Sequence, residues 1–284
     1  MNTNAELKNV VREKYAEIAT QSKTQNASSC CGASACCGDE VYNIMADDYS
    51  KLEGYNPDAD LGLGCGLPTE FAKIKEGDTV IDLGSGAGND AFIARKLVGE
   101  KGRVIGIDFT EPMITKARAN ADKLSFNNVE FRQGDIEDMP VASNIADVIV
   151  SNCVLNLVPN KHKVFSEIHR VLKPGGHFSI SDIVLEGELP GKWKDVAEMY
   201  AGCISGAIQK NDYLAIIEEA GFKNLTVQKD KTIIIPDTIL ENYFSKEEIT
   251  AFKNSNTRIT SITVYAEKPA KDDRNCCEPG SGCC

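Results

Sequence analysis

The segment Val80–Asp90 (VIDLGSGAGND) constrains the fold more than any other part of this chain. A short apolar strand at Thr79–Leu83 runs into a glycine-rich turn, and a helix is predicted over Asn89–Val98. Glycines in such a turn let a ligand approach the backbone, and the amides that begin the following helix point toward it. The turn therefore predicts an α/β fold with a ligand site beside the first strand.

Strands and helices alternate along the next part of the chain. Further elements are predicted as strands at Arg103–Asp108, Val129–Gln133, Ala146–Ser151 and His177–Ile183, and as helices over Glu111–Lys123 and Lys161–Leu172. Alternation of this kind predicts a parallel, doubly wound sheet with right-handed crossovers.

The remaining sequence suggests a division into four parts. Residues 1–40 are expected to form an N-terminal helix (about Ala5–Thr20) and a cysteine-rich tether, and residues 269–284 a cysteine-rich tail that is disordered without a ligand. Residues 41–185 hold the core, preceded by a lid over Tyr42–Phe71 that is broken by Gly and Pro.

Residues 186–268 are expected to form a smaller α+β C-terminal cap domain, because the strand–helix rhythm changes after Glu186. Its predicted elements are helices over Trp193–Tyr200 and Asp212–Ala220 and strands at Leu225–Val227, Thr232–Ile235 and Ile259–Glu267.

Composition narrows the class of function. The formal net charge of −11 would repel a polyanion, so no nucleic-acid partner is expected, and the substrate should be small and neutral or cationic. No apolar run is long enough to span a membrane. The N-terminus lacks the apolar core of a signal peptide, so we expect a cytoplasmic protein.

The cysteines fall into two groups. Eight of the 11 form adjacent pairs, Cys30 and Cys31, Cys36 and Cys37, Cys276 and Cys277, and Cys283 and Cys284, whereas Cys65, Cys153 and Cys203 stand alone. A reducing cytosol and a core of this size argue against a disulfide scaffold. We interpret the thiols as ligands, nucleophiles or redox groups.

Several features beyond the glycine turn narrow the ligand. Asp108 ends the second strand, where a carboxylate can accept hydrogen bonds from ribose hydroxyls. The turn reads GSGAG rather than GxGxxG, Asp135 follows the third strand in QGDIEDMP, and LKPGG precedes the fifth. Together these features resemble the class I methyltransferase family over about Thr79–Ile183, although a sheet that binds NAD or no ligand stays open.

The resemblance implies S-adenosylmethionine as cofactor and a Rossmann-like methyltransferase sheet. It also implies a cofactor pocket lined by Asp82, Gly84, Ser85, Gly86, Gly88, Asp108, Met113, Asp135, Ile136 and Asn152.

The side chains outside the cofactor motifs bear on the kind of methyl acceptor. Transfer from a sulfonium needs an aligned nucleophile and exclusion of water, whereas a carbon or oxygen acceptor normally also needs a base. We interpret the three histidines as structural or surface residues: His162, His169 and His177. The chain offers thiols instead, with Cys65 on the lid, Cys153 after the fourth strand and Cys203 in the C-terminal part.

The motifs GLGCGLP, SNCVLNLVPNK and GCISGA, in this order around the core, resemble the arsenite methyltransferase family over about Asp39–Pro269. The resemblance implies that Cys65, Cys153 and Cys203 bind trivalent arsenic, and that arsenite and methylarsenite are converted to mono- and dimethylated arsenicals in detoxification. Thiolates are natural ligands of soft arsenic, and three sulfurs can form a pyramid that leaves its lone pair free.

Methylation makes arsenic formally pentavalent, so two electrons must return it to the trivalent state. The resemblance implies that an N-terminal cysteine, Cys30 or Cys31, works with Cys65, and that a thiol reductant such as thioredoxin or glutathione completes the cycle. The C-terminal cysteines could capture arsenic, act as reductants or hold zinc together with the N-terminal pairs: Cys276, Cys277, Cys283 and Cys284.

Two other functions stay open. A small-molecule C- or O-methyltransferase would use the same core, but has no reason to place the three isolated thiols together. A thiol-based metalloid-binding protein would explain the thiols, but needs no glycine turn with Asp108 and Asp135.

Overall fold

The computed structural model describes residues 4–20, 47–190, 203–204 and 206–270. Its centre is a seven-stranded sheet in the order β3-β2-β1-β4-β5-β7-β6. The strands are β1 (Thr79–Leu83), β2 (Arg103–Asp108), β3 (Val129–Gln133), β4 (Ala146–Asn152), β5 (Leu172–Glu186), β6 (Lys223–Thr232) and β7 (Arg258–Glu267).

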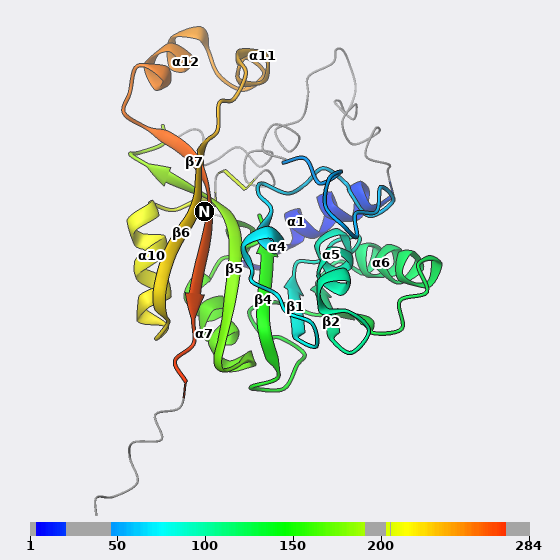
Figure 1. Ribbon diagram of the computed structural model, residues 1–284. Coiled ribbons are helices and arrows are strands. Elements are labelled where there is room, and N and C mark those ends of the chain that lie inside the picture. Colours follow the sequence, from blue (N-terminus) through cyan, green and yellow to red (C-terminus); the bar gives the residue numbers. More distant parts are fainter. Residues whose placement is uncertain (1–3, 21–46, 191–202, 205, 271–284) are drawn as a thin grey trace, which may run out of the picture.

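Helices cover both faces of the sheet (Figure 1). Helices α5 (Asn89–Val98) and α6 (Glu111–Lys123) pack on one face, and α7 (Lys161–Val171) and α10 (Lys210–Glu219) on the other. The shorter or peripheral elements are α1 (Asn4–Ala19), α4 (Pro68–Phe71), η1 (Leu155–Leu157), α11 (Asp237–Leu240) and α12 (Lys246–Lys253).

Strand β1 illustrates why the sheet is buried on both sides. Ile81 and Leu83 pack into the apolar cluster formed with α7 and α10, whereas Val80 packs into the cluster formed with α5 and α6. All three are fully buried. A strand covered on both faces reads as a continuous apolar run, as the TVIDL segment does.

The predicted Rossmann-like core is confirmed. Strands β1 to β5 pair in parallel, and the ranges predicted for β1, β2 and β3 match the structure. The fifth strand differs, because it begins at Leu172 rather than His177. Leu172 pairs with Ala146, and a register irregularity follows before Val148. The helix α7 therefore ends where the LKPGG segment begins, with Leu172 as its C-cap, and LKPGG itself is the start of β5.

The C-terminal part extends the central sheet instead of forming a second one. Strand β7 pairs antiparallel with β5, and β6 pairs antiparallel with β7. The strand predicted at Thr232–Ile235 is wrong, since Thr232 ends β6 and the next residues are irregular. Ile233 and Ile235 are buried in an apolar cluster, which explains their strand-like pattern. The helix predicted at Trp193–Tyr200 lies outside the described residues.

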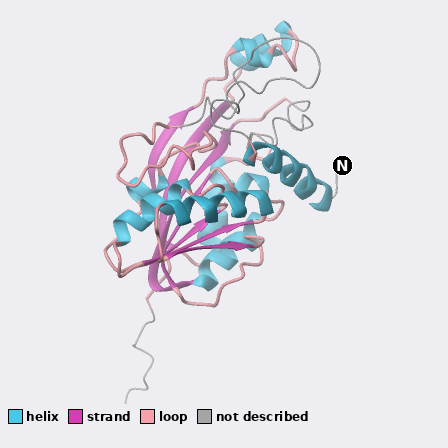
Figure 2. Ribbon diagram, turned by 90° about the vertical axis from the view of Figure 1, so that its right-hand side faces the viewer, coloured by secondary structure: helices cyan, strands magenta, loops and turns pink. Residues whose placement is uncertain are grey.

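The N-terminal helix and the lid lie at one end of the sheet. Figure 1 shows α1 and the chain that follows residue 47 beside the carboxyl ends of the parallel strands, and Figure 2 shows the N-terminal helix from the side. Helix α1 is attached to α6, where the Lys116 Nζ donates to the Ala19 carbonyl at 3.1 Å. Within the described ranges, no helix combines the length and the apolar character that crossing a bilayer requires.

Candidate active site

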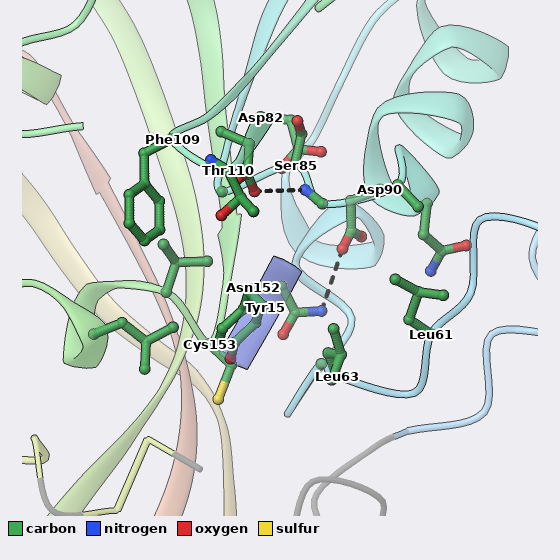
Figure 3. A pocket seen from close by; sticks show the side chains of 18 of the residues that line it. Tyr15, Leu61, Leu63, Asp82, Ser85, Asp90, Phe109, Thr110, Asn152 and Cys153 are labelled. Atoms are coloured by element: carbon green, nitrogen blue, oxygen red, sulfur yellow. Dashed lines mark hydrogen bonds between the residues drawn. The ribbon is translucent and has the colours of Figure 1, made fainter. Parts of the chain in front are cut away.

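A cavity opens at the carboxyl edge of β1, β2 and β4 (Figure 3). The glycine turn after β1 forms one wall, and α1 and the segment 59–64 close it from outside. Most of the predicted cofactor residues line this cavity: Asp82, Gly84, Ser85, Gly86, Asp108, Asp135, Ile136 and Asn152. Brought together from separate strand ends, they form a single surface.

Met113 and Gly88 were also predicted to line the pocket, but the structure places them behind its wall. Met113 is fully buried in the apolar cluster between α5 and α6, and Phe109 and Thr110 line the cavity instead. Gly88 is the N-cap of α5 with φ of 101°, and an added Cβ would lie 2.8 Å from the Phe92 ring. Its small size therefore serves helix packing.

Buried carboxylates dominate the inner wall. Burial raises the pKa of Asp82, Asp90 and Asp108, and the neighbouring charges of Asp90 and Asp108 raise that of Asp82 further. The pKa of Asp90 is raised to about 6. Among the described residues that line the cavity, Lys8 is the one basic side chain, and it pairs with Asp135 at 2.6 Å and with Glu137. The inner wall therefore favours a ligand with positive charge.

The glycine turn leaves space and open hydrogen-bonding atoms. The Gly86 amide donates to Asp108 Oδ2 at 3.0 Å, and the Thr110 amide donates to Asp108 Oδ1 at 2.8 Å, which holds the turn against β2. Nothing lies within 4 Å of a Cβ built on Gly86. Asp82 Oδ2 and Ser85 Oγ are buried and have no hydrogen-bond partner among the described residues. A polar, cationic ligand with hydroxyl groups fits this wall, as S-adenosylmethionine would.

Asn152 clamps the lid onto the end of β4. Its Oδ1 accepts from the Cys65 amide at 2.9 Å, and its Nδ2 donates to the Gly66 carbonyl at 2.8 Å. The same Nδ2 contacts the Tyr49 hydroxyl and lies 3.3 Å from Asp90 Oδ2, while Tyr49 donates to Asp90 at 2.9 Å. Figure 3 shows Asn152 between Asp90 and Cys153, so one amide links the acidic wall to the thiols.

The structure brings the three isolated cysteines together. The Cys153 thiol hydrogen-bonds with the thiols of Cys65 and Cys203, and the Cys203 thiol also donates to the Cys153 carbonyl at 2.9 Å. All three are unpaired and buried. Of the three, Cys153 lines the cofactor cavity. It is therefore the junction between the cavity and the thiol cluster, defined here as Cys65, Cys153 and Cys203.

Backbone conformation at the cluster is unusual. Cys153 has φ of 61° and Cys203 has φ of 66°, in the left-handed region that residues with a Cβ seldom adopt. The Cys153 amide donates to the Ser181 carbonyl at 2.8 Å, which holds this turn at the end of β4. Strained residues of this kind are typical of functional sites.

The thiols are neighbours without forming a closed metal site. Hydrogen bonds from the other two thiols, together with burial, raise the pKa of Cys153 well above its usual range, and burial raises that of Cys65. Both are therefore protonated at neutral pH. No group of His, Cys, Asp or Glu in the described ranges is arranged to hold a metal ion.

Some lining residues had no clear signal in the sequence. Asp90 stands inside the glycine motif, and its position next to the turn could have identified it. Lys8 and Tyr15 on α1 and Tyr49 on the lid lie far from the motif, and no local pattern marks them. The paired cysteines lie outside the described residues: Cys30, Cys31, Cys36, Cys37, Cys276, Cys277, Cys283 and Cys284.

Known proteins share this architecture. A methyltransferase domain family matches residues 74–221. An arsenite methyltransferase of Halobacterium salinarum is 40% identical over 94% of this chain and 68% of its own length. One of Aquipseudomonas alcaligenes is 34% identical over 81% of this chain and 66% of its own length. The chain thus spans about two thirds of both relatives.

A solved structure agrees with these relatives. The crystal structure of an arsenic(III) S-adenosylmethionine methyltransferase from Chlamydomonas reinhardtii superposes with a TM-score of 0.62 at 33% identity. The match covers 81% of this chain and 73% of that one. The likeness therefore includes both the core and the segments on either side of it.

Proposed function

The chain belongs to the arsenite methyltransferase family, and from that premise we propose that it methylates trivalent arsenic bound by Cys65, Cys153 and Cys203, with S-adenosylmethionine in the adjoining cavity. The observation that carries the proposal is the place of Cys153. Its thiol contacts both other thiols, and the same residue lines the cavity wall. Methyl donor and acceptor would therefore meet at this residue.

The acidic half of the cavity holds the methyl donor. S-adenosylmethionine supplies an electrophilic methyl carbon on a positively charged sulfur, and that bond breaks as the methyl group leaves. Asp82 and Asp90 provide negative charge for a cationic ligand, and the Asp108 carboxylate stands where a ribose would be bound. Helix α1 closes the cavity, and excluding water strengthens these interactions.

The thiol half holds the acceptor. Arsenite is neutral at pH 7, and each thiol proton can leave with one arsenic-bound hydroxide as water while an As–S bond forms. Protonated thiols are therefore suitable starting groups, and no buried base is needed. Three As–S bonds leave the arsenic lone pair free, and the Asn152 clamp keeps Cys65 and Cys153 in register with the cavity.

The transfer oxidises arsenic formally from the trivalent to the pentavalent state. A second thiol restores it by attacking an arsenic-bound sulfur: the S–S bond forms, the As–S bond breaks with its electron pair returning to arsenic, and the attacking thiol releases one proton. We assign this role to Cys65 with Cys30 or Cys31. An external thiol reductant, such as thioredoxin or glutathione, then reduces the disulfide and allows arsenite and methylarsenite to pass through in turn.

Arsenic speciation after incubation with S-adenosylmethionine, arsenite and a thiol reductant tests the proposal. Wild-type protein should yield mono- and dimethylated arsenic. Cys153→Ser should lower turnover on the order of 100-fold, because a misplaced acceptor loses alignment with the methyl group. Ser179→Ala is the matched control, since its buried hydroxyl has no hydrogen-bond partner among the described residues and its loss should leave turnover unchanged.

Each result has a separate meaning. Cys153→Ser with wild-type turnover and intact cofactor binding would contradict the assignment of the thiols. Arsenite binding without methyl transfer by the wild type would favour a metalloid-binding protein. Cofactor binding without either would point to an organic acceptor.

A further inference from the structure

A buried polar cluster that the proposed chemistry does not use lies behind the thiols. Asp182 on β5 is fully buried, and Lys161, the first residue of α7, is 8% exposed. Tyr213 of α10 is 1% exposed and completes the group. Ions are buried in an apolar core at a high cost, which only well-placed partners offset. The partners of this cluster therefore indicate what it does.

The cluster joins four segments of the chain. Lys161 Nζ donates to the Gly206 carbonyl at 3.0 Å, and the Lys161 and Asp182 charges attract each other. The Tyr213 hydroxyl lies 3.3 Å from Asp182 Oδ2, and the Ile183 amide donates to Asp182 Oδ1 at 3.1 Å. Strand β5, helices α7 and α10 and the residues after Cys203 are thus held to one point.

The same cluster adjoins all three thiols. The Asp182 charge raises the pKa of Cys65, and Lys161 Nζ donates to the carbonyl of Gly206, three residues after Cys203. The residue before Asp182, Ser181, accepts the Cys153 amide through its carbonyl.

Cys203 needs such support more than the other two thiols. Cys65 is clamped by Asn152, and Cys153 directly follows β4. Cys203 lies outside the described helices and strands, at a φ of 66° that costs a residue with a Cβ free energy. The hydrogen bond from the Lys161 ammonium to the Gly206 carbonyl is strong and directional, because its donor is charged.

We propose that Lys161 and Asp182 are positioning residues of the arsenic site, which hold the Cys203 segment so that the third thiol reaches arsenic. The inference rests on the proposed function, because it assumes that the three thiols share one arsenic atom. Lys161 acts through the Gly206 carbonyl, and Asp182, oriented by Tyr213, keeps the ammonium in place. Neither side chain touches the methyl donor.

The test compares wild type with the double variant Lys161→Met/Asp182→Asn, which removes both charges and leaves neither ion uncompensated. Arsenic X-ray absorption of the arsenite-loaded protein should show three sulfur neighbours in the wild type and two in the variant. The KM for arsenite should rise on the order of 10-fold or more, while the KM for S-adenosylmethionine stays unchanged. Lys163→Met, at an exposed position on the same helix, is the matched control and should behave as wild type.

The inference would be overturned if the folded double variant had three sulfur neighbours around arsenic and a wild-type KM for arsenite. Methylation by the wild type would in that case still support the proposed function. If the double variant does not fold, Tyr213→Phe removes only the hydroxyl that faces Asp182 and is read in the same way. A several-fold rise in the KM for arsenite supports the inference, and unchanged coordination and KM overturn it. Absence of arsenic methylation in the wild type would instead reject the proposed function.

Discussion

The two halves of the cavity are built in different ways. The cofactor half takes its residues from the ends of adjacent parallel strands, with Asp82 on β1, Asp108 on β2 and Asp135 after β3. The thiol half takes Cys65 from the lid before β1 and Cys203 from the segment before α10, on either side of Cys153. The first half follows from strand order, whereas the second depends on packing between distant segments.

The difference extends to chemistry. The cofactor half presents buried carboxylates to a cation, and the thiol half presents buried sulfurs to a soft, neutral acceptor. Asn152 and Cys153 connect the two halves. A change confined to one half should therefore leave binding by the other nearly intact.

The largest difference between the effects on cofactor binding and on arsenite binding is expected from Gly86→Ala. The glycine has φ of 50°, and its Cβ would enter open space in the cavity. The added methyl group should weaken binding of S-adenosylhomocysteine by about 1–3 kcal/mol, roughly 5- to 150-fold, as measured by calorimetry. Arsenite binding by the thiols should be unchanged.

Gly175→Ala is the matched control for this change. Gly175 also has a positive φ, 84°, and open space at its Cβ, but it does not line the cavity. Equal losses of cofactor affinity in both variants would mean that backbone strain, and not occupied ligand space, explains the result.

A smaller effect is expected from the charge of Asp90. Its pKa is about 6 because burial disfavours the carboxylate, so the group is mostly ionised at pH 7 and mostly protonated at pH 5. Affinity for cationic S-adenosylmethionine should therefore fall by roughly tenfold at most as the pH drops from 7 to 5. The neutral-sulfur product, S-adenosylhomocysteine, should change less.

Asp90→Asn should remove this pH-dependent difference between the two ligands, whereas Asp212→Asn, at an exposed acid on α10, should keep it. A wild-type preference that does not vary with pH would exclude Asp90 as the titrating group. The comparison shows whether the acidic half distinguishes the cationic cofactor from its neutral product by the charge of Asp90.

The smallest effect is expected from Lys8→Met on α1. Lys8 pairs with Asp135, which is 40% exposed, and with Glu137, which is 9% exposed, so solvent screens the first ion pair and both lie at the edge of the cavity. The substitution should change cofactor affinity by less than about 1 kcal/mol. Its main effect should be faster cofactor release, measured by stopped-flow fluorescence. An unchanged release rate would show that the ion pairs of Lys8 do not hold α1 over the cavity.

Sequence alone determined much of the cofactor half. The TVIDL strand, the glycine turn and the alternation that follows are local patterns, and the carboxyl ends of adjacent parallel strands necessarily meet at one edge. Asp82, Gly86 and Asp108 could therefore be placed together without coordinates. The errors were also local in origin, because burial of Ile233 and Ile235 imitates the period of a strand.

Tertiary structure alone decided which distant groups meet. The sequence marked Cys65, Cys153 and Cys203 as unusual, but only packing shows that their thiols touch and that Cys153 also faces the cavity. Met113 was placed in the pocket by resemblance, and the packing of α6 turns it into the core. Lys161 and Asp182 stand in unremarkable segments, and only the fold buries them beside one another. Such contacts depend on how the helices pack against the sheet, and no local pattern of residues determines this packing.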